Sequence, residues 1–440
     1  MIVLSGASLV LPDRVLSPGT LVIEDGRISE IRSDAPSGGH AGAFAFHGHY
    51  IVPGFIDVHL HGIDGIDTLD LEPRGAVAAI AARLPRYGVT AFCPTTVACG
   101  PAALREVLDQ VRGARETPAA RSARVLPAHL ESNFINPEFQ GAQPPACLRS
   151  ARAALDPSRT GEAGGAGRAG RAGEPGRAGR TGPAEQPDFT AADILSEIER
   201  ATPDVGIVTL ASELDGGLDL VRWLVSRGHL VSLGHSGATY EEALAAIAAG
   251  ARHATHLFNR MPTFGHRAPG LVGAVLQTDE VAAEIVCDGV HVHPAVMRTA
   301  IAAKGPSRIL AITDATAAAG LPVGSHARLG GQLITAGEQT ALLPDGTIAG
   351  SVLTMDRAFQ ILIGRVGLGL VDAAMVCSTS PARELGLVGH GVLAADAIAD
   401  LVVLDANFSV VQTYVAGQLV YARGPRMASP EGTDPPRSME

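Results

Sequence analysis

Apolar runs and helix-like stretches alternate along the chain from about residue 203. The runs VGIVTLAS, HLVSLGHS and HATHLF are short and apolar, and the stretches LDLVRWLVSRG and TYEEALAAIAAG between them carry apolar residues at helical spacing. Strands of four to eight residues that alternate with helices of ten or more predict βαβ units and a parallel sheet.

The same alternation recurs around RYGVTAFCPTT, RVLPAHLES, VAAEIVCDGV and SRILAITDAT, which gives about eight strand candidates between residues 50 and 380. Eight strands, each followed by a helix, are what a (β/α)8 barrel requires. A doubly wound open sheet is the alternative, but no GxGxxG follows the first strand of any unit. We therefore predict an α/β fold with a TIM-like (β/α)8 barrel over residues 53–387.

The two ends of the chain show a different pattern. SLVLPD, TLVIEDGRISEIR, ADLVVLD and VQTYVAGQLVYARG are short alternating segments interrupted by DG, AG and PD turns, which is typical of hairpin strands. We expect residues 1–52 and 388–425 to pair into one small β-sandwich domain beside the barrel.

Two further segments lack the residues needed to form a core. Residues 151–187 are mainly Gly, Ala, Arg and Pro, so we predict a disordered insertion there, and we predict a flexible tail at 426–440. A basic disordered tract can bind polyanions, but we favour an insertion in a surface loop, because long loop insertions cost little free energy.

Composition limits the class of protein further. The 440 residues are 46% hydrophobic and include five scattered cysteines without a CxxC pair, which argues against a disulfide framework or a zinc ribbon and favours the cytoplasm. No apolar run of about 18 residues suggests a membrane span. The net charge of −11 argues against a nucleic-acid surface, and an anionic substrate would need a local cluster of cations.

Polar side chains recur where the predicted strands end. They are His59, His61, Glu131, His235, His256 and Asp314. Alternation along a strand puts His59 and His61 on one face together with Asp57. In a barrel the carboxyl ends of the strands converge on one face, so these six groups would meet in one cleft. Histidine and carboxylate together suit Zn²⁺ or another borderline divalent ion.

Several longer motifs carry a family resemblance. They are VPGFIDVHLHG, HLESNFINPEF with GAQP, LGHSGATYEEA, THLFNRMPTFGHRAPGLVGA, CDGVHV, ITDATAAAG, GSVLTM and ADLVVLD. In this order and spacing the chain resembles the N-acetylglucosamine-6-phosphate deacetylases of the amidohydrolase superfamily over nearly its whole length. The resemblance implies metal-dependent hydrolysis of the acetamide of N-acetyl-D-glucosamine 6-phosphate, which yields D-glucosamine 6-phosphate and acetate in amino-sugar catabolism.

The resemblance also implies roles for the strand-end residues. Glu131, His235 and His256 would hold the principal metal, and His59 and His61 match an HxH that some members use for a second ion. Zn²⁺ is the expected ion, one or two per subunit, with Fe²⁺ and Mn²⁺ as alternatives. Asp57 would orient a histidine ligand. Asp314 is placed to accept a proton from the attacking water and return it to the leaving amine.

The substrate site implied by the resemblance has a phosphate part and a sugar part. Arg267 and His291 would bind the phosphate, with Arg267 reaching in from a neighbouring subunit of a homodimer. The remaining candidates are Ala142, Gln143, Asn259, Arg260, Asp288, Gly289, Val290, Ile348, Ala349 and Gly350. His253, His266 and His293 are interpreted as surface groups or as groups behind the ligands. The only lysine, Lys304, precedes a strand, so we do not expect a carboxylated bridging lysine.

Three departures from the family pattern lie beside this chemistry. The chain has Glu131-Ser132-Asn133 for Glu-Gly-Pro, Gln143 for a histidine, and Arg260 for an alanine. They leave open another N-acetylated amino-sugar phosphate, such as galactosamine 6-phosphate, or a related amide as substrate. A non-catalytic barrel homologue is a further alternative, but it should lack a ligand or the base, and all are present.

Overall fold

Eight parallel strands form a barrel in the computed structural model, which describes residues 1–33, 43–70, 75–156 and 188–424. They pair in chain order, and a parallel bridge between Leu60 and Ala315 joins the first strand to the segment after the last. The predicted (β/α)8 barrel is confirmed. The strands are β6 (Phe55–Leu60), β9 (Val89–Thr96), β11 (Ala128–Glu131), β12 (Val205–Leu210), β13 (Leu230–Leu233), β14 (His253–Ala254), β15 (Ala282–Val286) and β16 (Ile309–Ile312), and β10 (Arg124–Val125) adds to β9.

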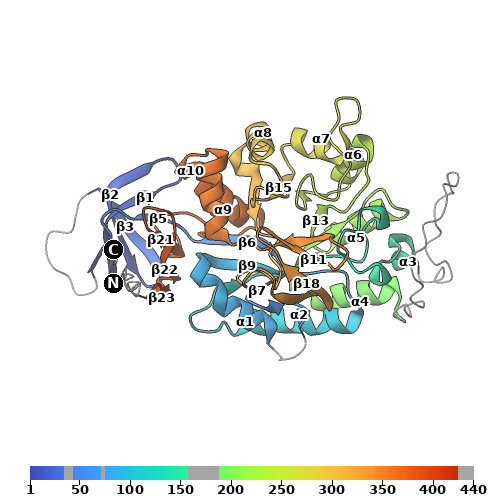
Figure 1. The fold of residues 1–440 in the computed structure, drawn as a ribbon, viewed down its shortest axis with the longest axis horizontal. Coiled ribbons are helices and arrows are strands. Elements are labelled where there is room, and N and C mark those ends of the chain that lie inside the picture. The colour runs from blue at the N-terminus through green and yellow to red at the C-terminus, as the bar shows by residue number, and fades with distance from the viewer. Residues whose placement is uncertain (34–42, 71–74, 157–187, 425–440) are drawn as a thin grey trace, which may run out of the picture.

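Helices surround the barrel (Figure 1). Thr190 and Thr239 each begin a helix with a capping box, which satisfies backbone N–H groups of the first turn. The helices are α1 (Ala76–Arg83), α2 (Pro101–Glu116), α4 (Ala191–Ala201), α5 (Gly217–Ser226), α6 (Tyr240–Ala248), α7 (Gly270–Gln277), α8 (Pro294–Lys304), α9 (Met355–Ile361), α10 (Leu370–Ala374) and α11 (Ser380–Glu384). Within the described ranges, none of the helices combines the length and apolarity needed to cross a bilayer.

Strands from both ends of the chain share one eight-stranded sheet, as the sequence predicted (left in Figure 1). β5 and β21 join the two halves as antiparallel partners, with Val52 opposite Val402. Alternate side chains, including Leu4, Leu21 and Leu401, form a separate core. The strands are β1 (Ile2–Val10), β2 (Val15–Glu24), β3 (Arg27–Arg32), β4 (Ala43–Ala45), β5 (Tyr50–Pro53), β21 (Leu401–Leu404), β22 (Val410–Val415) and β23 (Gln418–Ala422).

A four-stranded antiparallel sheet, which the sequence pattern did not predict, lies between β16 and α9. It consists of β17 (His326–Leu329), β18 (Gln332–Ala336), β19 (Thr340–Leu342) and β20 (Ile348–Ser351). Its buried residues include Ile334 and Ala341. The Ser351 N–H donates to the Asp314 carbonyl at 2.8 Å, so this sheet is tied to the barrel beside Asp314. A short hairpin, β7 (Gly62–Ile63) with β8 (Ile66–Asp67), follows the first barrel strand.

The start of the predicted disordered insertion is helical, which corrects its boundary. Helix α3 (Ala151–Leu155) begins at Ser150, whose side chain accepts from the Ala153 N–H. Ala151 and Ala154 are buried in the core that also contains residues of α4 and α5, and Arg152 forms ion pairs with Asp215 and Asp219. Two small buried apolar side chains, a cap and these ion pairs therefore stabilise this turn. The rest of the predicted insertion, 157–187, and the predicted tail lie outside the described residues.

Candidate metal centre

The structure brings the six predicted strand-end groups together at the carboxyl end of the barrel. His59 and Glu131 are in β6 and β11, and His61 directly follows β6. His235, His256 and Asp314 each stand two residues beyond the end of β13, β14 and β16. All six are buried. The convergence expected for the carboxyl ends of barrel strands is therefore present.

Three of these residues have left-handed backbone conformations. The φ angles are 47° at His235, 28° at His256 and 49° at Asp314. Such a conformation costs on the order of 1–3 kcal/mol for a residue with a Cβ, and it persists only where the surroundings enforce it. Here the Asp314 N–H donates to the His59 carbonyl at 3.0 Å, and the His256 N–H donates to Glu284 Oε2 at 3.1 Å. Strain concentrated at one spot indicates a functional site.

Glu131, His235 and His256 form the first cluster of metal-ligating type. Glu131 Oε1 lies 3.0 Å from His235 Nε2 and 2.9 Å from His256 Nε2, and the two ring nitrogens are 3.0 Å apart. The other nitrogen of His235, Nδ1, faces the Phe139 carbonyl at 2.8 Å and must donate to it, which leaves a lone pair on Nε2 of the neutral ring. Lone pairs that face each other at this distance repel unless a proton or a metal ion lies between them, so the cluster fits a metal once the rings are neutral.

His59, His61 and Asp314 form a second cluster beside the first. His59 Nε2 lies 3.2 Å from His61 Nε2, and Asp314 Oδ1 lies 3.3 Å from His61 Nε2 and 3.6 Å from His59 Nε2. Glu131 Oε2 is 3.5 Å from His61 Nε2, which links the two clusters. Two imidazoles and shared carboxylates are a donor set that suits a borderline divalent ion.

The electrostatics of the centre favour a cation. Burial disfavours ionised carboxylates, but His61 and His59 hold the pKa of Asp314 below its ordinary value, and His235 and His59 hold that of Glu131 well below it. Burial alone would lower the pKa of His59, because it disfavours the charged ring. The negative charges of Glu284, Glu131 and Asp314 outweigh this effect and raise the pKa of His59 to about 10. Several ionised carboxylates therefore face one buried space, and positive charge is needed to balance them.

Two of the three departures from the family pattern, Gln143 and the Ser132–Asn133 pair, have distinct contacts. Gln143 Nε2 donates to Glu131 Oε2, and Gln143 Oε1 accepts from the Ala98 N–H at 2.7 Å. Ser132 Oγ donates to the Thr209 carbonyl, and Asn133 Nδ2 donates to the carbonyls of Cys99 and Cys147. Ser132 and Asn133 therefore satisfy buried backbone groups, whereas Gln143 fixes the carboxylate of a candidate metal ligand, a contact that the sequence did not predict.

The CDGVHV motif forms a turn at the end of β15. Asp288 Oδ1 accepts from the N–H groups of Val290 and His291 at 2.8 and 2.9 Å, and Asp288 Oδ2 pairs with His291 Nδ1 at 2.6 Å. Gly289 has a φ of 78°. Burial lowers the pKa of His291, but the hydrogen bond and charge of Asp288 raise it above its ordinary value. The pair can thus present a cationic ring to an anion.

Strand β20 carries three of the predicted sugar-site residues. Ile348 is exposed, Ala349 is buried, and Gly350 has a φ of 66°. A Cβ at Gly350 would lie 2.8 Å from the Asp314 carbonyl oxygen, so only glycine lets this strand approach Asp314. The neighbouring Ala142 carbonyl accepts from Gln332 of β18 at 2.8 Å.

The loop after β14 contains the remaining candidates. Asn259 Nδ2 donates to the His256 carbonyl at 3.2 Å. The Arg260 side chain covers Gly141, where a Cβ would lie 2.5 Å from Arg260 Nε. Arg267 is exposed, and its guanidinium donates to His266 Nε2 at 2.7 Å. Arg267 is therefore on a surface loop, and its contribution to a neighbouring subunit stays a prediction.

Sequence reasoning missed Glu284, which lies behind the second cluster. Its carboxylate contacts His59 Nδ1 at 2.9 Å and His253 Nε2 at 3.0 Å. Asp57, for which we predicted this role, instead accepts from the His59 backbone N–H and from Thr313. A glutamate within the otherwise apolar strand AAEIV was the available signal.

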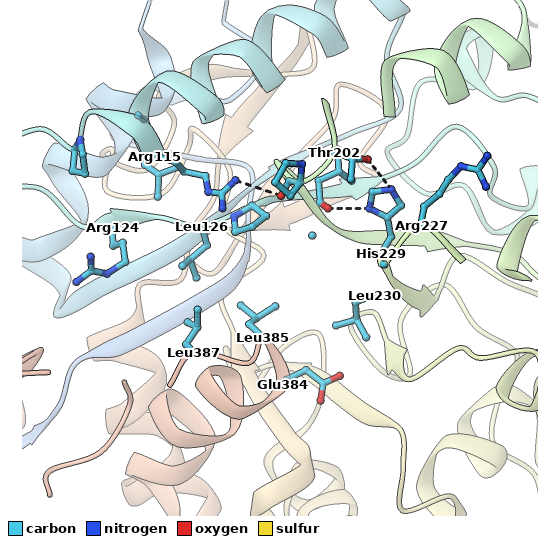
Figure 2. Close-up of a pocket in the computed structure, with 18 residues that line it drawn as sticks. Arg115, Arg124, Leu126, Thr202, Arg227, His229, Leu230, Glu384, Leu385 and Leu387 are labelled. Carbon is cyan, nitrogen blue, oxygen red and sulfur yellow. Dashed lines mark hydrogen bonds between the residues drawn. The ribbon is translucent and has the colours of Figure 1, made fainter. Parts of the chain in front are cut away.

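A pocket of about 620 Å³ lies away from the centre, at the amino ends of the barrel strands (Figure 2). Its lining includes Arg124 of β10, Val205 of β12 and Leu230 of β13, together with Glu384. None of the predicted site residues lines it. Because barrel enzymes carry their sites at the carboxyl ends of the strands, this pocket is not the candidate site.

This chain is similar to known proteins over most of its length. A family model described as the amidohydrolase family matches residues 50–420. The N-acetylglucosamine-6-phosphate deacetylase of Bacillus subtilis (strain 168) is 31% identical over 418 residues, covering 94% of this chain and 96% of that protein. The one from Homo sapiens is 35% identical over 435 residues, covering 95% and 94%.

Solved structures agree with these relatives. A mutant N-acetyl-D-glucosamine-6-phosphate deacetylase of Mycobacterium smegmatis, in complex with N-acetyl-D-glucosamine-6-phosphate, superposes with a TM-score of 0.79 at 30% identity, covering 95% of this chain and 99% of that chain. The Pasteurella multocida enzyme gives 0.80 at 25% identity, covering 96% and 100%. The chain thus belongs to the amidohydrolase family, and within it to the N-acetylglucosamine-6-phosphate deacetylase family, as its motifs predicted.

Proposed function

We propose that this protein hydrolyses the acetamide of N-acetyl-D-glucosamine 6-phosphate to D-glucosamine 6-phosphate and acetate. The observation that carries the proposal is the Glu131–His235–His256 cluster with Asp314 beside it, at the carboxyl end of the barrel. Relatives that bear the name of this activity align with nearly the whole chain. A non-catalytic homologue would have no need to keep both the ligand set and the acid–base group.

Glu131, His235 and His256 are the residues that would hold the principal divalent ion, and His59 and His61 would hold a second. Zn²⁺ suits the nitrogen and carboxylate donors, and Fe²⁺ and Mn²⁺ are the alternatives. When bound there, an ion would supply two effects, a lower pKa of bound water, from 15.7 to about 7, and polarisation of an amide carbonyl.

Asp314 is the proposed proton carrier. Its carboxylate is buried, and the neighbouring histidines keep its pKa low, so it is ionised at neutral pH and can accept the proton of the attacking water. It would then return that proton to the amine nitrogen as the C–N bond breaks. The carboxylate lies beside His61 Nε2 at 3.3 Å and His59 Nε2 at 3.6 Å.

The phosphate would be bound by cations around the mouth of the barrel. His291, whose cationic form is favoured by its pairing with Asp288, and Arg260 are the candidates from the same chain. Arg267 of the partner subunit in a homodimer would complete the set, since its exposed guanidinium can extend away from its own barrel.

A different N-acetylated amino-sugar phosphate is the second candidate substrate. It is favoured by Arg260, which lies over Gly141, and by Gln143, which contacts Glu131 where the family has a substrate-binding histidine. A changed contact near the amide and a bulky cation near the phosphate would alter which N-acetylated amino-sugar phosphate fits the site.

Acetate release from a panel of substrates tests the proposal. The panel contains N-acetylglucosamine 6-phosphate, N-acetylgalactosamine 6-phosphate and both sugars without phosphate. We expect the highest kcat/KM for N-acetylglucosamine 6-phosphate and a much lower value for either unphosphorylated sugar. Preference for the galactosamine epimer would select the second candidate, and no acetate from any member with metal-loaded protein would refute deacetylation.

A further inference from the structure

Glu284 occupies the interior of the barrel, where a charged side chain is costly to bury. Its side chain is fully buried in the middle of β15. An isolated carboxylate in such a place would lose several kcal/mol of hydration. Three donors compensate it, namely His59 Nδ1 at 2.9 Å, His253 Nε2 at 3.0 Å and the His256 backbone N–H at 3.1 Å. Glu284 thus contacts the ring of one candidate metal ligand and the backbone of another.

The contact with His59 determines which ring nitrogen can bind a metal. A carboxylate accepts hydrogen bonds, so the proton of a neutral His59 ring is placed on Nδ1 and the lone pair on Nε2. Nε2 is the atom that lies 3.2 Å from His61 Nε2 and 3.6 Å from Asp314 Oδ1. Without Glu284, the proton could move to Nε2, and that tautomer cannot bind an ion in the second cluster.

His61 has no equivalent support within the described part of the chain. Its Nδ1 is buried without a hydrogen-bond partner there. The orientation of the second cluster therefore depends on His59, and through it on Glu284. The first cluster differs, because the Phe139 carbonyl fixes the ring of His235 without any contribution from Glu284.

A second layer keeps Glu284 itself in place. His253 lies between two carboxylates, with Nε2 at 3.0 Å from Glu284 Oε1 and Nδ1 at 3.2 Å from Glu384 Oε1. Glu384 also contacts Arg308 at 3.5 Å, and it lines the pocket at the opposite end of the barrel (Figure 2). Glu284, His253 and Glu384 thus form a continuous series of contacts from the second cluster to the amino ends of the strands. Acidic and basic groups alternate along this series.

We propose that Glu284 is a positioning residue that gives His59 the tautomer and orientation needed to hold a second divalent ion, with His253 and Glu384 holding Glu284 in turn. The proposal rests on the metal centre of the proposed function and extends it, because it makes the occupancy of the second position depend on a residue that touches neither ion nor substrate. The first position, at Glu131, His235 and His256, contacts Glu284 through the His256 backbone N–H at 3.1 Å. An amide oxygen at position 284 can still accept this hydrogen bond, so we expect the first position not to depend on the charge of Glu284.

Zinc binding to the full-length protein tests this role without any substrate. Metal-free wild type, Glu284→Gln and the His59→Ala/His61→Ala double variant are titrated with Zn²⁺ against a competing chelator, and bound zinc is counted by mass spectrometry. We expect two ions in the wild type and one in the double variant. In Glu284→Gln the first ion should bind as in the wild type, and the Kd of the second should rise by about 10–100-fold, the usual range for a changed partner of a histidine ligand, because a neutral amide holds the Nδ1 proton of His59 less firmly than a carboxylate.

Asp400→Asn is the matched control, because Asp400 is also a buried carboxylate that pairs with a histidine, His390, at 2.8 Å, but in the terminal β domain. It should bind two ions with wild-type affinities. Unchanged second-ion affinity in Glu284→Gln, equal losses in Asp400→Asn, or a single ion in the wild type would each overturn the proposal.

Two further measurements keep the result interpretable. If circular dichroism shows that Glu284→Gln is unfolded, His253→Gln replaces it. This variant should weaken the second ion several-fold and leave the first unchanged, and unaltered binding would contradict the proposal. Acetate release is measured separately, so a protein that binds two ions as expected but releases no acetate refutes the proposed function and leaves the role of Glu284 standing.

Discussion

Asp314 has a left-handed backbone, a buried carboxylate and two neighbouring imidazoles. Together these features suit a residue that transfers protons. In Asp314→Asn the amide has nearly the same shape but cannot accept a proton. We expect turnover to fall by at least about 10²-fold, the contribution of a positioned general base, with the first bound zinc ion and the melting temperature nearly unchanged. Steady-state kinetics and metal analysis of the same preparation check this. Near-wild-type turnover would remove Asp314 from the mechanism.

Gln143 has two possible roles, and they make different predictions. If its main role is to hold Glu131 Oε2, Gln143→Leu should weaken binding of the first zinc ion by about 10–100-fold. If it serves only the substrate, zinc affinity should stay constant and KM should rise. We expect the first result, because both polar atoms of the Gln143 amide are already bonded within the protein.

Gln332→Ala is the control for this measurement. Gln332 contacts the Ala142 carbonyl beside Gln143, and among the described residues its side chain has no hydrogen bond to a candidate metal ligand. The zinc affinity of this variant should equal that of the wild type. An equal loss in both variants would mean that the loop, and not the Gln143 amide, supports the metal.

The sequence identified individual site residues where a metal-ligating or acid–base side chain stands at the end of a predicted strand. His59, His61, Glu131, His235, His256 and Asp314 could be found by counting from apolar runs, since barrel geometry then brings them together. Glu284 could not be found in this way, because it lies within a strand and its partners come from β6 and β14. The contact between Gln143 and Glu131 depends on the path of a loop, which residue pattern does not determine.

Among the secondary structure elements, α3 gives a direct test of where the core ends. Ala154 is buried in the core shared with α4 and α5, so Ala154→Asp would bury an unpaired charge, and the melting temperature should fall by several degrees. Deletion of residues 160–185 should change the melting temperature and activity little, because that stretch has almost no apolar residues to bury. Calorimetry of both variants checks these two predictions.

The two results together define the boundary. A large loss of stability in the deletion variant would mean that the segment contributes to packing. An unchanged melting temperature in Ala154→Asp would mean that α3 contributes little to the stability of the fold, as expected if the disordered insertion began at residue 151.

Elements with regular patterns were predictable, and short irregular ones were not. The barrel strands are apolar runs followed by helical stretches, so local pattern was sufficient. Strands β17 to β20 have three to five residues each with mixed burial, and such strands are stabilised by pairing partners instead of by their own pattern. Helix α3 was missed because its composition continues into the Gly/Ala/Arg/Pro segment.

For the whole molecule, net charge is the main constraint on a phosphorylated substrate. A chain with a net charge of −11 repels a phosphate except where cations gather. If Arg267 serves the neighbouring subunit, mixing Asp314→Asn protomers with Arg267→Ala protomers should restore activity. Each mixed dimer then contains one site with an intact base and the arginine of the other chain.

The mixing experiment requires that exchange is verified, for example with two affinity tags. We expect about half of the wild-type activity per purified mixed dimer, and almost none from either parent. Mixed dimers that stay inactive would place Arg267 in its own subunit's site, and an Arg267→Ala parent with wild-type activity would place it outside any site. An Arg267→Lys variant should also lose kcat/KM, because lysine cannot form the bidentate contact of a guanidinium with phosphate.

The pairing of β5 with β21 has a consequence for synthesis on the ribosome. β1 to β5 are made first, but the edge of β5 that binds β21 stays unpaired until residues 401–404 have been translated. At 5–20 residues per second, the intervening stretch of about 350 residues takes roughly 20–70 s. Throughout that time an apolar edge strand is open to other nascent chains. A premature stop codon anywhere in the barrel would make that exposure permanent, so truncated products should aggregate through their first fifty residues.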